Sequence, residues 1–399
     1  MKLEAFLNPK SVAVIGASRE EKKVGHRVLK NLINSGFKGR IYPVNPNADT
    51  ILGYKCYKSV GEIGEDVDLA VVAVPAKAVL DVAEECGRKG VRGIIIISAG
   101  FSETGREGLV LEKKLVSKCR EYGIRLQGPN CLGLINARIG LNASFAPTSP
   151  IPGSVSIVSQ SGALGSAILN WAGFNNMGLS NFVSVGNEAD LTITDFLEAL
   201  AEDENTRVVG VYMEGVKNGE RFLKVAGSLS RRKPLVVLKA GTTEVGVRAV
   251  SSHTGSLAGS DIAFSAACKK TGVLRVDTMR EFFDMLFALQ DQPVPRGKNV
   301  LVITNGGGPG VLAVDACEKL GLNLPLLERE LREKLSKNFP PHASLGNPID
   351  VLGDADENRY RLALQAALRS SVVDSIIVIL TPQAMTPSEE VARVIVEEK

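Results

Sequence analysis

The chain has 399 residues, of which 44% are hydrophobic and 23% charged, a composition typical of a folded globular protein and not of a disordered one. Its 47 basic and 44 acidic residues leave a formal net charge of only +3, which excludes the strongly positive surface of a nucleic-acid-binding protein. The apolar runs are far shorter than the ~18 residues that span a bilayer, and no apolar signal peptide begins the chain. We therefore expect a cytoplasmic protein of two or three domains without a membrane partner.

The first 141 residues alternate short apolar strands with amphipathic helices. Strands are expected at 11–15, 40–44, 68–74, 93–98 and 125–127, and helices at 24–35, 78–89 and 109–122. Continuous Val and Ile runs between such helices are typical of a parallel sheet covered on both faces. The pattern predicts an α/β domain over residues 1–141.

Two linkers divide the rest of the chain. Residues 142–153 contain three prolines and few charges, and they precede a second α/β unit at 154–290. Residues 291–298 form the second expected linker, before a third unit at 299–399 that begins with a strand. About a hundred residues is short for a five-stranded wound sheet, so we expect the third unit to be incomplete. The six cysteines lie far apart, which indicates reduced thiols and neither disulfides nor a zinc site.

Small and polar residues follow several strands of the first unit. These loops are Gly16-Ala17-Ser18, Val44-Asn45-Pro46, Val74-Pro75, Ser98-Ala99-Gly100 and the segment around Asn130. Ligands of open α/β sheets bind at the carboxyl ends of strands, so the loops together favour a nucleotide-like ligand, although each alone can be read as turn punctuation. Asn45 stands where a NAD site has an acid for the ribose, which argues against NAD.

The turn Ser159-Gln160-Ser161-Gly162 joins a strand to a helix and contains no acid. Hydroxyls and free amides at a helix N-terminus suit an anion. The same residue types also make an ordinary helix N-cap, so the pattern alone leaves both interpretations open. A similar glycine-rich turn at 305–310 carries the same ambiguity.

His253 is one of only three histidines and lies among Ser, Thr and Gly residues at 251–260. Because it is not on an apolar face, it is a candidate general base or nucleophile, and no neighbour stands at a metal-ligand spacing. Glu214 ends the apolar strand expected at 208–213, where a carboxylate can orient a histidine. The alternative for Glu214 is an ordinary strand-end acid that faces water.

These motifs together resemble the α subunit of an ADP-forming acetate–CoA ligase (an NDP-forming acyl-CoA synthetase), a relative of the succinyl-CoA synthetase α subunit. The resemblance covers the whole chain and is carried by FLNPKSVAVIGAS, IYPVNP, AVPA, SAGF, GPNCLG, SIVSQSGALG, SVGNEADL, YMEG, KAGTT, SSHTGSLAGS and ASLGNPIDVLGDA. It implies a Rossmann-like CoA-binding domain followed by two flavodoxin-like domains, and the reaction of acyl-CoA, phosphate and ADP to give acid, CoA and ATP.

The resemblance also implies roles for individual residues. His253 would be the phosphorylated histidine, Glu214 the acid that supports it, and Asn130 a neighbour of the acyl group. Ser159, Gln160, Ser161 and Gly162 would hold the phosphate, and the four loops from Gly16 to Gly100 would bind CoA or acetyl-CoA. An ATP-grasp β subunit, in an α2β2 hetero-oligomer, would hold ADP or ATP and Mg²⁺, with no metal site in this chain. The alternative is a non-catalytic CoA-sensing module of related domain plan.

Overall fold

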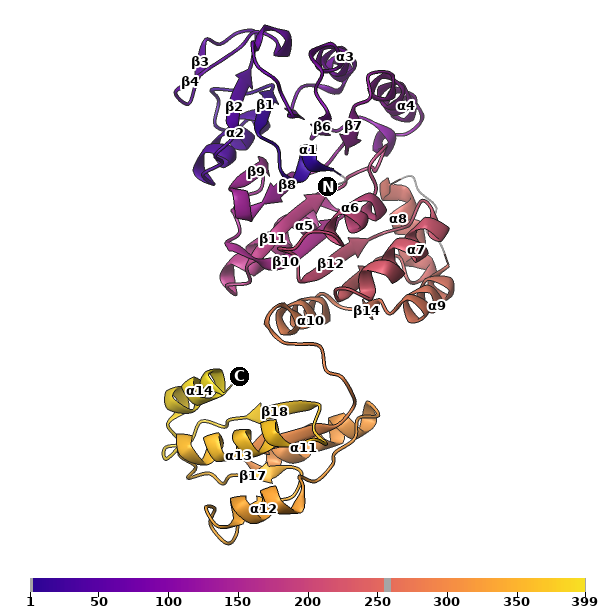
Figure 1. Ribbon diagram of the computed structural model, residues 1–399. Helices are drawn as coiled ribbons and strands as arrows, with labels where there is room; N and C mark the ends of the chain where they lie inside the picture. The colour runs from indigo at the N-terminus through magenta and orange to yellow at the C-terminus, as the bar shows by residue number, and fades with distance from the viewer. Residues whose placement is uncertain (1–2, 255–259, 399) are drawn as a thin grey trace. The chain divides into compact units, whose positions relative to one another are not determined.

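The computed structural model describes residues 3–254 and 260–398, apart from the side chains of 251–254. The chain divides into two compact units, Met1–Gln292 and Pro293–Lys399, each of which is described by itself (Figure 1). Within the described residues, no helix is both long and apolar enough to cross a membrane.

The first sheet contains five parallel strands in the order β2-β1-β5-β6-β7. Its elements are β1 (Ser11–Ile15), β2 (Arg40–Val44), β5 (Leu69–Val72), β6 (Gly93–Ile96), β7 (Arg125–Gln127), α2 (Val24–Asn34), α3 (Val79–Lys89) and α4 (Arg106–Glu121). Beyond the first residues of β2 and β7, the strand side chains are buried, which explains the continuous Val and Ile runs. Helices α3 and α4 pack on one face of this sheet and α2 on the other (Figure 1).

Short elements decorate this first sheet. They are α1 (Glu4–Leu7), the hairpin strands β3 (Thr50–Ile51) and β4 (Tyr54–Lys55), and the 3₁₀ turns η1 (Val60–Glu62), η2 (Ala76–Ala78) and η3 (Ser102–Thr104). A fourth 3₁₀ turn, η4 (Ala137–Ile139), packs against the second sheet.

The second sheet has seven strands in the order β14-β13-β12-β10-β11-β8-β9. Its elements are β8 (Gly133–Asn136), β9 (Leu141–Ser144), β10 (Pro152–Ser159), β11 (Leu179–Ser184), β12 (Val208–Met213), β13 (Leu235–Lys239), β14 (Leu274–Val276), α5 (Gly162–Phe174), α6 (Ile193–Leu200), α7 (Gly219–Ser230), α8 (Glu244–Thr254), α9 (Asp261–Thr271) and α10 (Met279–Asp291). The five strands from β10 to β14 are parallel, and the hairpin β8–β9 extends the sheet antiparallel to β11.

The segment 142–153, expected as a linker, contains most of β9 and the start of β10. Its first residues form a strand because α2 of the first sheet packs against it: Asn31 Nδ2 donates to the carbonyls of Ser144 and Ala146, each over 2.9 Å. One hydrophobic cluster continues from the α2 face of the first sheet to helices α6 and α7 of the second. The first two expected domains therefore form a single compact unit.

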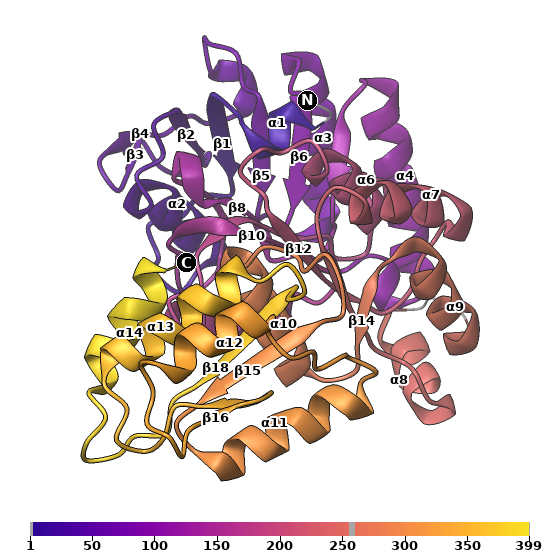
Figure 2. The same ribbon diagram turned by 60° about the horizontal axis from the view of Figure 1, so that its bottom comes forward.

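The second unit contains a sheet of four strands in the order β16-β17-β15-β18. Its elements are β15 (Val300–Thr304), β16 (Ser344–Leu345), β17 (Ile349–Asp350), β18 (Ser375–Ile379), α11 (Gly307–Lys319), α12 (Arg329–Ser336), α13 (Glu357–Arg369) and α14 (Ser388–Glu397) (Figure 2). Strands β17 and β18 run parallel to β15. The core includes fully buried Tyr360, whose hydroxyl donates to the Ile379 carbonyl over 3.0 Å. The predicted α/β class with parallel sheets is confirmed.

Candidate active site

Loops that follow successive strands meet at the carboxyl edge of the first sheet. Asn45 Nδ2 donates to the Ala17 carbonyl over 2.7 Å, which joins the loop after β2 to the loop after β1. The Ser98 hydroxyl donates to the Val74 carbonyl, which joins the loops after β6 and β5. The Asn130 N–H donates to the Ser98 carbonyl over 3.0 Å. The structure therefore brings together the segments that the sequence placed at one edge.

Gly16 packs closely against the loop that follows β5. It has a φ of +89°, and a Cβ at this position would lie 2.6 Å from the Ala73 carbonyl oxygen. Its N–H donates to the Val44 carbonyl over 3.0 Å. Only glycine fits this turn, which carries the chain from β1 towards α2. At the same edge, Pro46 and Pro75 are exposed and accessible to a ligand.

Helix α5 starts at the carboxyl end of β10, as the sequence predicts. Ser161 is its N-cap and accepts from the Leu164 N–H over 3.2 Å. The N–H groups of Gly162 and Ala163 have no acceptor among residues 3–254 and 260–398, and both residues line the large cavity described below. These two amides, at the positive end of a helix of 13 residues, can bind an anion.

Ser159 and Gln160 use their polar groups inside the protein. The fully buried Ser159 hydroxyl donates to the Ser161 carbonyl over 2.8 Å. Gln160 Nε2 donates to Glu188 over 2.8 Å and to the Gly215 carbonyl over 3.1 Å, while its Oε1 accepts from the N–H groups of Glu214 and Gly215. Among the four residues predicted to hold phosphate, these two therefore use their side chains to shape the turn, and Gln160 also lines the large cavity.

Glu214 directly follows β12 and is only 7% exposed. Burial of the neighbouring Tyr212, together with the charge of Glu214 and a hydrogen bond to it, raises the pKa of the Tyr212 phenol to about 12. Glu214 also lines the large cavity. A buried carboxylate at this strand end has the location required to orient a histidine, and the hypothesis of an acid that faces water does not fit its burial.

His253 lies near the end of α8, which spans Glu244–Thr254. Its side chain lies outside the described part of the chain. The expected pairing of His253 with Glu214 therefore stays a prediction.

One cavity of about 740 Å³ is lined by Asn130, by the N-terminus of α5 and by Glu214. Its apolar wall is formed by Ile97, Leu109, Leu132, Phe145 and Ala163. Its polar wall includes Glu103, Glu112, Asn130, Gln160, Ser161, Asn187, Glu188, Glu214 and Lys217. The cavity lies between the loops of the first sheet and the strand ends of the second, so a ligand bound at the first sheet can reach the N-terminus of α5.

Asn187 connects the two sheets across this cavity. Its Nδ2 lies 2.6 Å from Glu103 Oε2, 3.0 Å from Glu112 Oε2 and 3.1 Å from Ser102 Oγ. Its Oδ1 accepts from Asn130 Nδ2 over 3.3 Å. The loop after β11 is thus fixed to the loop after β6 and to Asn130.

A second cavity, of about 360 Å³, lies at the start of α2. It is lined by Glu21, Lys22, Lys23, Val24, Arg27 and Phe145. Three cations face one acid here, so the site favours anions such as phosphates. Phe145 lines both cavities, which places the basic site next to the wall of the large cavity.

The loop after β11, and Lys217 in the loop after β12, were not predicted from the sequence as parts of the site. Asn187, Glu188 and Lys217 all line the large cavity, and Glu188 is buried with 4% exposure. The motif SVGNEADL contains the first two, yet a short polar stretch after a strand reads as a turn. An acid two residues after a glycine at the end of a buried strand is the local sequence signal that could have marked Glu188.

Known families match three stretches of the chain. A CoA binding domain matches residues 10–137, a succinyl-CoA ligase like flavodoxin domain matches 152–289, and a ligase-CoA domain matches 300–398. The α subunit of acetate–CoA ligase (ADP-forming) I from Pyrococcus furiosus is 48% identical over 100% of this chain and 87% of its own length. The chain belongs to the ADP-forming acetate–CoA ligase family.

Other members of this ligase family extend the match. Acetate–CoA ligase (ADP-forming) I of Archaeoglobus fulgidus is 48% identical over 96% of this chain, which spans only 55% of that longer relative. The solved acetyl-coenzyme A synthetase 1 of Candidatus Korarchaeum cryptofilum, in complex with phosphate and ADP, superposes with a TM-score of 0.95 at 42% identity. That match covers 99% of this chain and 85% of the solved one. The predicted family and the assignment to the ligases are confirmed.

Proposed function

We propose that this chain is the α subunit of an ADP-forming acyl-CoA synthetase, which converts acyl-CoA, phosphate and ADP into free acid, CoA and ATP. One observation carries the proposal: Asn130, the N-terminus of α5 and Glu214 line a single cavity. Relatives of matching length are subunits of acetate–CoA ligases, which supports acetate as the acid.

CoA would bind along the carboxyl edge of the first sheet. Its nucleotide would contact the loops Gly16–Ser18, Val44–Pro46, Val74–Pro75 and Ser98–Gly100. Lys22, Lys23 and Arg27 supply positive charge beside these loops for the CoA phosphates. The thioester end would then pass Phe145 and enter the large cavity near Asn130.

Inorganic phosphate would bind at the N-terminus of α5. The Gly162 and Ala163 N–H groups have no acceptor within the described residues, and both residues line the same cavity as Asn130. Amides at a helix N-terminus stabilise an anion by up to about 2 kcal/mol when partly buried. A phosphate oxygen held there can attack the thioester carbonyl, and the CoA thiolate leaves as the acyl phosphate forms.

His253 would then take the phosphoryl group. A ring nitrogen of the neutral imidazole attacks phosphorus, the bond to the acyl oxygen breaks, and the carboxylate leaves. Glu214 would accept the N–H of the other ring nitrogen, which fixes the tautomer and stabilises the charge that develops on the ring. The phosphohistidine finally transfers its phosphoryl group to ADP.

The second subunit would be an ATP-grasp β subunit. Relatives named as α subunits support the existence of a partner. ADP and Mg²⁺ would bind in that partner, and an α2β2 hetero-oligomer is the expected assembly. The competing proposal, a CoA-sensing module without catalysis, predicts CoA binding but no phosphoenzyme.

Phosphoenzyme formation tests the proposal. The full chain, alone and with its co-purified partner, is incubated with acetyl-CoA and ³²P-phosphate. We expect acid-labile, base-stable label on the protein that depends on acetyl-CoA, disappears in His253→Ala and persists in His342→Ala, which alters an exposed histidine of the other unit. Label that persists in His253→Ala contradicts the assignment of the histidine. CoA binding without any label supports the non-catalytic module.

A further inference from the structure

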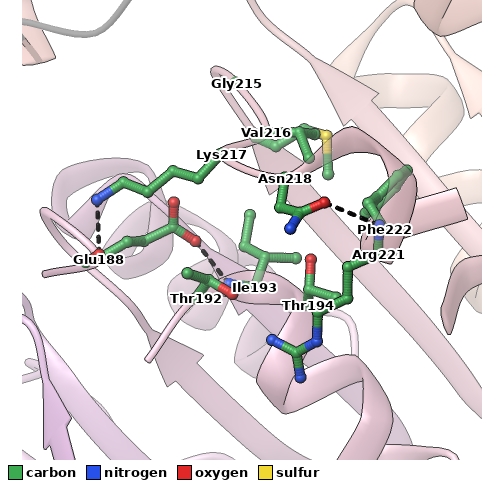
Figure 3. Close-up of a pocket in the computed structure, with 11 residues that line it drawn as sticks. Glu188, Thr192, Ile193, Thr194, Gly215, Val216, Lys217, Asn218, Arg221 and Phe222 are labelled. Carbon is green, nitrogen blue, oxygen red and sulfur yellow. Dashed lines mark hydrogen bonds between the residues drawn. The ribbon is translucent and has the colours of Figure 1, made fainter. Parts of the chain in front are cut away.

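Glu188 is a buried acid to which the proposed reaction gives no role. It follows β11 with a φ of 55° and is 4% exposed. It lines the large cavity and also a smaller one of about 90 Å³, which Figure 3 shows. Burial of a carboxylate is costly unless its oxygens accept hydrogen bonds, so its partners define what it does.

Both carboxylate oxygens of Glu188 accept from donors that lie on different elements. Oε1 accepts from the Ile193 N–H at the start of α6 over 2.5 Å, as Figure 3 shows. Oε2 accepts from Gln160 Nε2 over 2.8 Å. Lys217 Nζ donates to the Glu188 backbone carbonyl over 2.6 Å and supplies the nearest positive charge (Figure 3).

The Gln160 amide connects Glu188 to the backbone at Glu214 and Gly215 by hydrogen bonds. Its Oε1 accepts from the Glu214 N–H and, over 3.2 Å, from the Gly215 N–H. Gln160 is also the second residue of the turn that begins α5. A chain of hydrogen bonds therefore runs from the N-terminus of α6 through Glu188 and Gln160 to the backbone of Glu214.

The donors and acceptors in this chain of hydrogen bonds are fixed. The Ile193 N–H at one end and the Glu214 N–H at the other are both donors. The Glu188 carboxylate accepts from Ile193 and from Gln160 Nε2, and Gln160 Oε1 accepts from the Glu214 N–H. Gln160 can present its oxygen to Glu214 only if the residue at 188 accepts on both sides. A neutral amide at 188 turns a donor towards Ile193 or towards Gln160. A reversed Gln160 would in turn face the Glu214 N–H with its own donors.

We propose that Glu188 is a positioning residue that, through Gln160, holds the Glu214 segment and the turn of α5 in one fixed spacing. Glu214 and the N–H groups at the N-terminus of α5 must act on the same phosphoryl group. The spacing between them therefore governs transfer of that group to His253. The inference rests on the proposed function and assigns Glu188 no contact with substrate.

The test is Glu188→Gln in the full chain, with the rate of phosphoenzyme formation measured in a single turnover with acetyl-CoA and ³²P-phosphate. We expect this rate to fall by roughly 10- to 100-fold, since small misplacements of reacting groups cost about that much. The affinity for CoA should not change, because the CoA loops lie on the other sheet. Glu198→Gln is the matched control: it removes a carboxylate from helix α6, whose first N–H donates to Glu188, and should react like the wild type. The Glu198 carboxylate accepts from Arg221.

The exchange variant Glu188→Gln/Gln160→Glu distinguishes a positioning role of Glu188 from a general effect on the stability of the fold. It restores acceptors for both Ile193 and Glu214 and keeps the net charge, so its rate should exceed that of Glu188→Gln alone. Gln160→Glu alone completes the comparison. If the fold-losses in rate of the two single variants simply multiply in the double variant, the two residues act independently and the inference is overturned. A wild-type rate in Glu188→Gln also overturns it.

Gln160→Met probes the same contact from its half-buried end and decides the question should Glu188→Gln not fold. The expected result is again a slower phosphoenzyme step with unchanged CoA affinity, and a wild-type rate overturns the inference. Failure of the proposed function looks different, because then the wild type itself carries no label.

Discussion

The Asn187 amide lies between two carboxylates, so Asn187→Asp replaces a shared donor with a third acid. Asn187 Nδ2 has two hydrogens and lies within 3.1 Å of Glu103, Glu112 and Ser102. Glu112 is 7% exposed, so the site is poorly screened by water. Burial alone raises the pKa of Glu103, but hydrogen bonds from Asn187 and from the N–H groups of Gly100 and Phe101 hold it below its usual range.

The expected loss follows from the bonds that disappear. Each hydrogen bond to a charged group contributes about 1.5–3 kcal/mol, so loss of two costs about 3 kcal/mol or more at pH 7.5. For a large domain, this corresponds to a fall in Tm of roughly 6–12 °C. Like charges raise the pKa of the introduced carboxyl, which becomes a donor again as it protonates, so the loss should shrink between pH 7.5 and pH 5.

The assay is thermal and urea unfolding of the full chain, followed by the fluorescence of the single Trp171, at both pH values. Asn8→Asp is the matched control, because Asn8 Nδ2 also donates to a carboxylate, that of Glu4, but at an exposed site. Its expected effect is within about 0.5 kcal/mol. A loss below about 1 kcal/mol in Asn187→Asp, or an equal loss at both pH values, refutes the reasoning.

Three further outcomes are expected. Gly16→Ala places a Cβ 2.6 Å from the Ala73 carbonyl at a φ of +89° and should weaken CoA binding in calorimetry by at least tenfold, whereas unchanged affinity excludes Gly16 from the site. A hydrogen bond from its own backbone N–H, together with hydrogen bonds from Ser370 and Ser371, lowers the pKa of Glu328 to about 2. Hydrogen exchange at 329–336 should therefore stay slow above the ordinary Glu pKa and quicken as the pH falls towards 2. Glu328→Gln should show fast exchange throughout. All six cysteines are buried, and native protein at pH 8 should resist thiol reagents until urea is added.

The sequence predicted the first sheet closely because its strands are buried on both faces. A run such as Ser11–Ile15 has no polar alternation, and such a run between amphipathic helices fits only a covered parallel sheet. The hairpin β8–β9 was missed for the opposite reason. Its buried polar residues, Asn142 and Ser144, resemble a loop until α2 and its Asn31 side chain are packed against them.

The candidate site was predicted where backbone geometry defines it and missed where side chains from distant segments meet. The strand-end loops and the N-terminus of α5 follow from local pattern, since every parallel strand ends at the same edge. For Gln160, which was predicted to hold phosphate, the sequence did not reveal that its amide bonds to Glu188 and to the backbone at Glu214 and Gly215. The spacing of residues in the sequence does not reveal that the Gln160 side chain forms hydrogen bonds with residues 28 and 54 positions away.

Three consecutive residues after β11, Gly186 to Glu188, each make a different contact near the junction of the two sheets. Gly186 has a φ of +56°, and a Cβ there would lie 2.3 Å from the Pro129 carbonyl, so the chain turns tightly against the loop that contains Asn130. Asn187 then bonds to the loop after β6, and Glu188, at a φ of 55°, bonds to Gln160. The turn thus directs neighbouring side chains to the proposed CoA site and to the proposed phosphate site. The same backbone turn therefore supports both the loop that contains Asn130 and, through Gln160, the turn that begins α5.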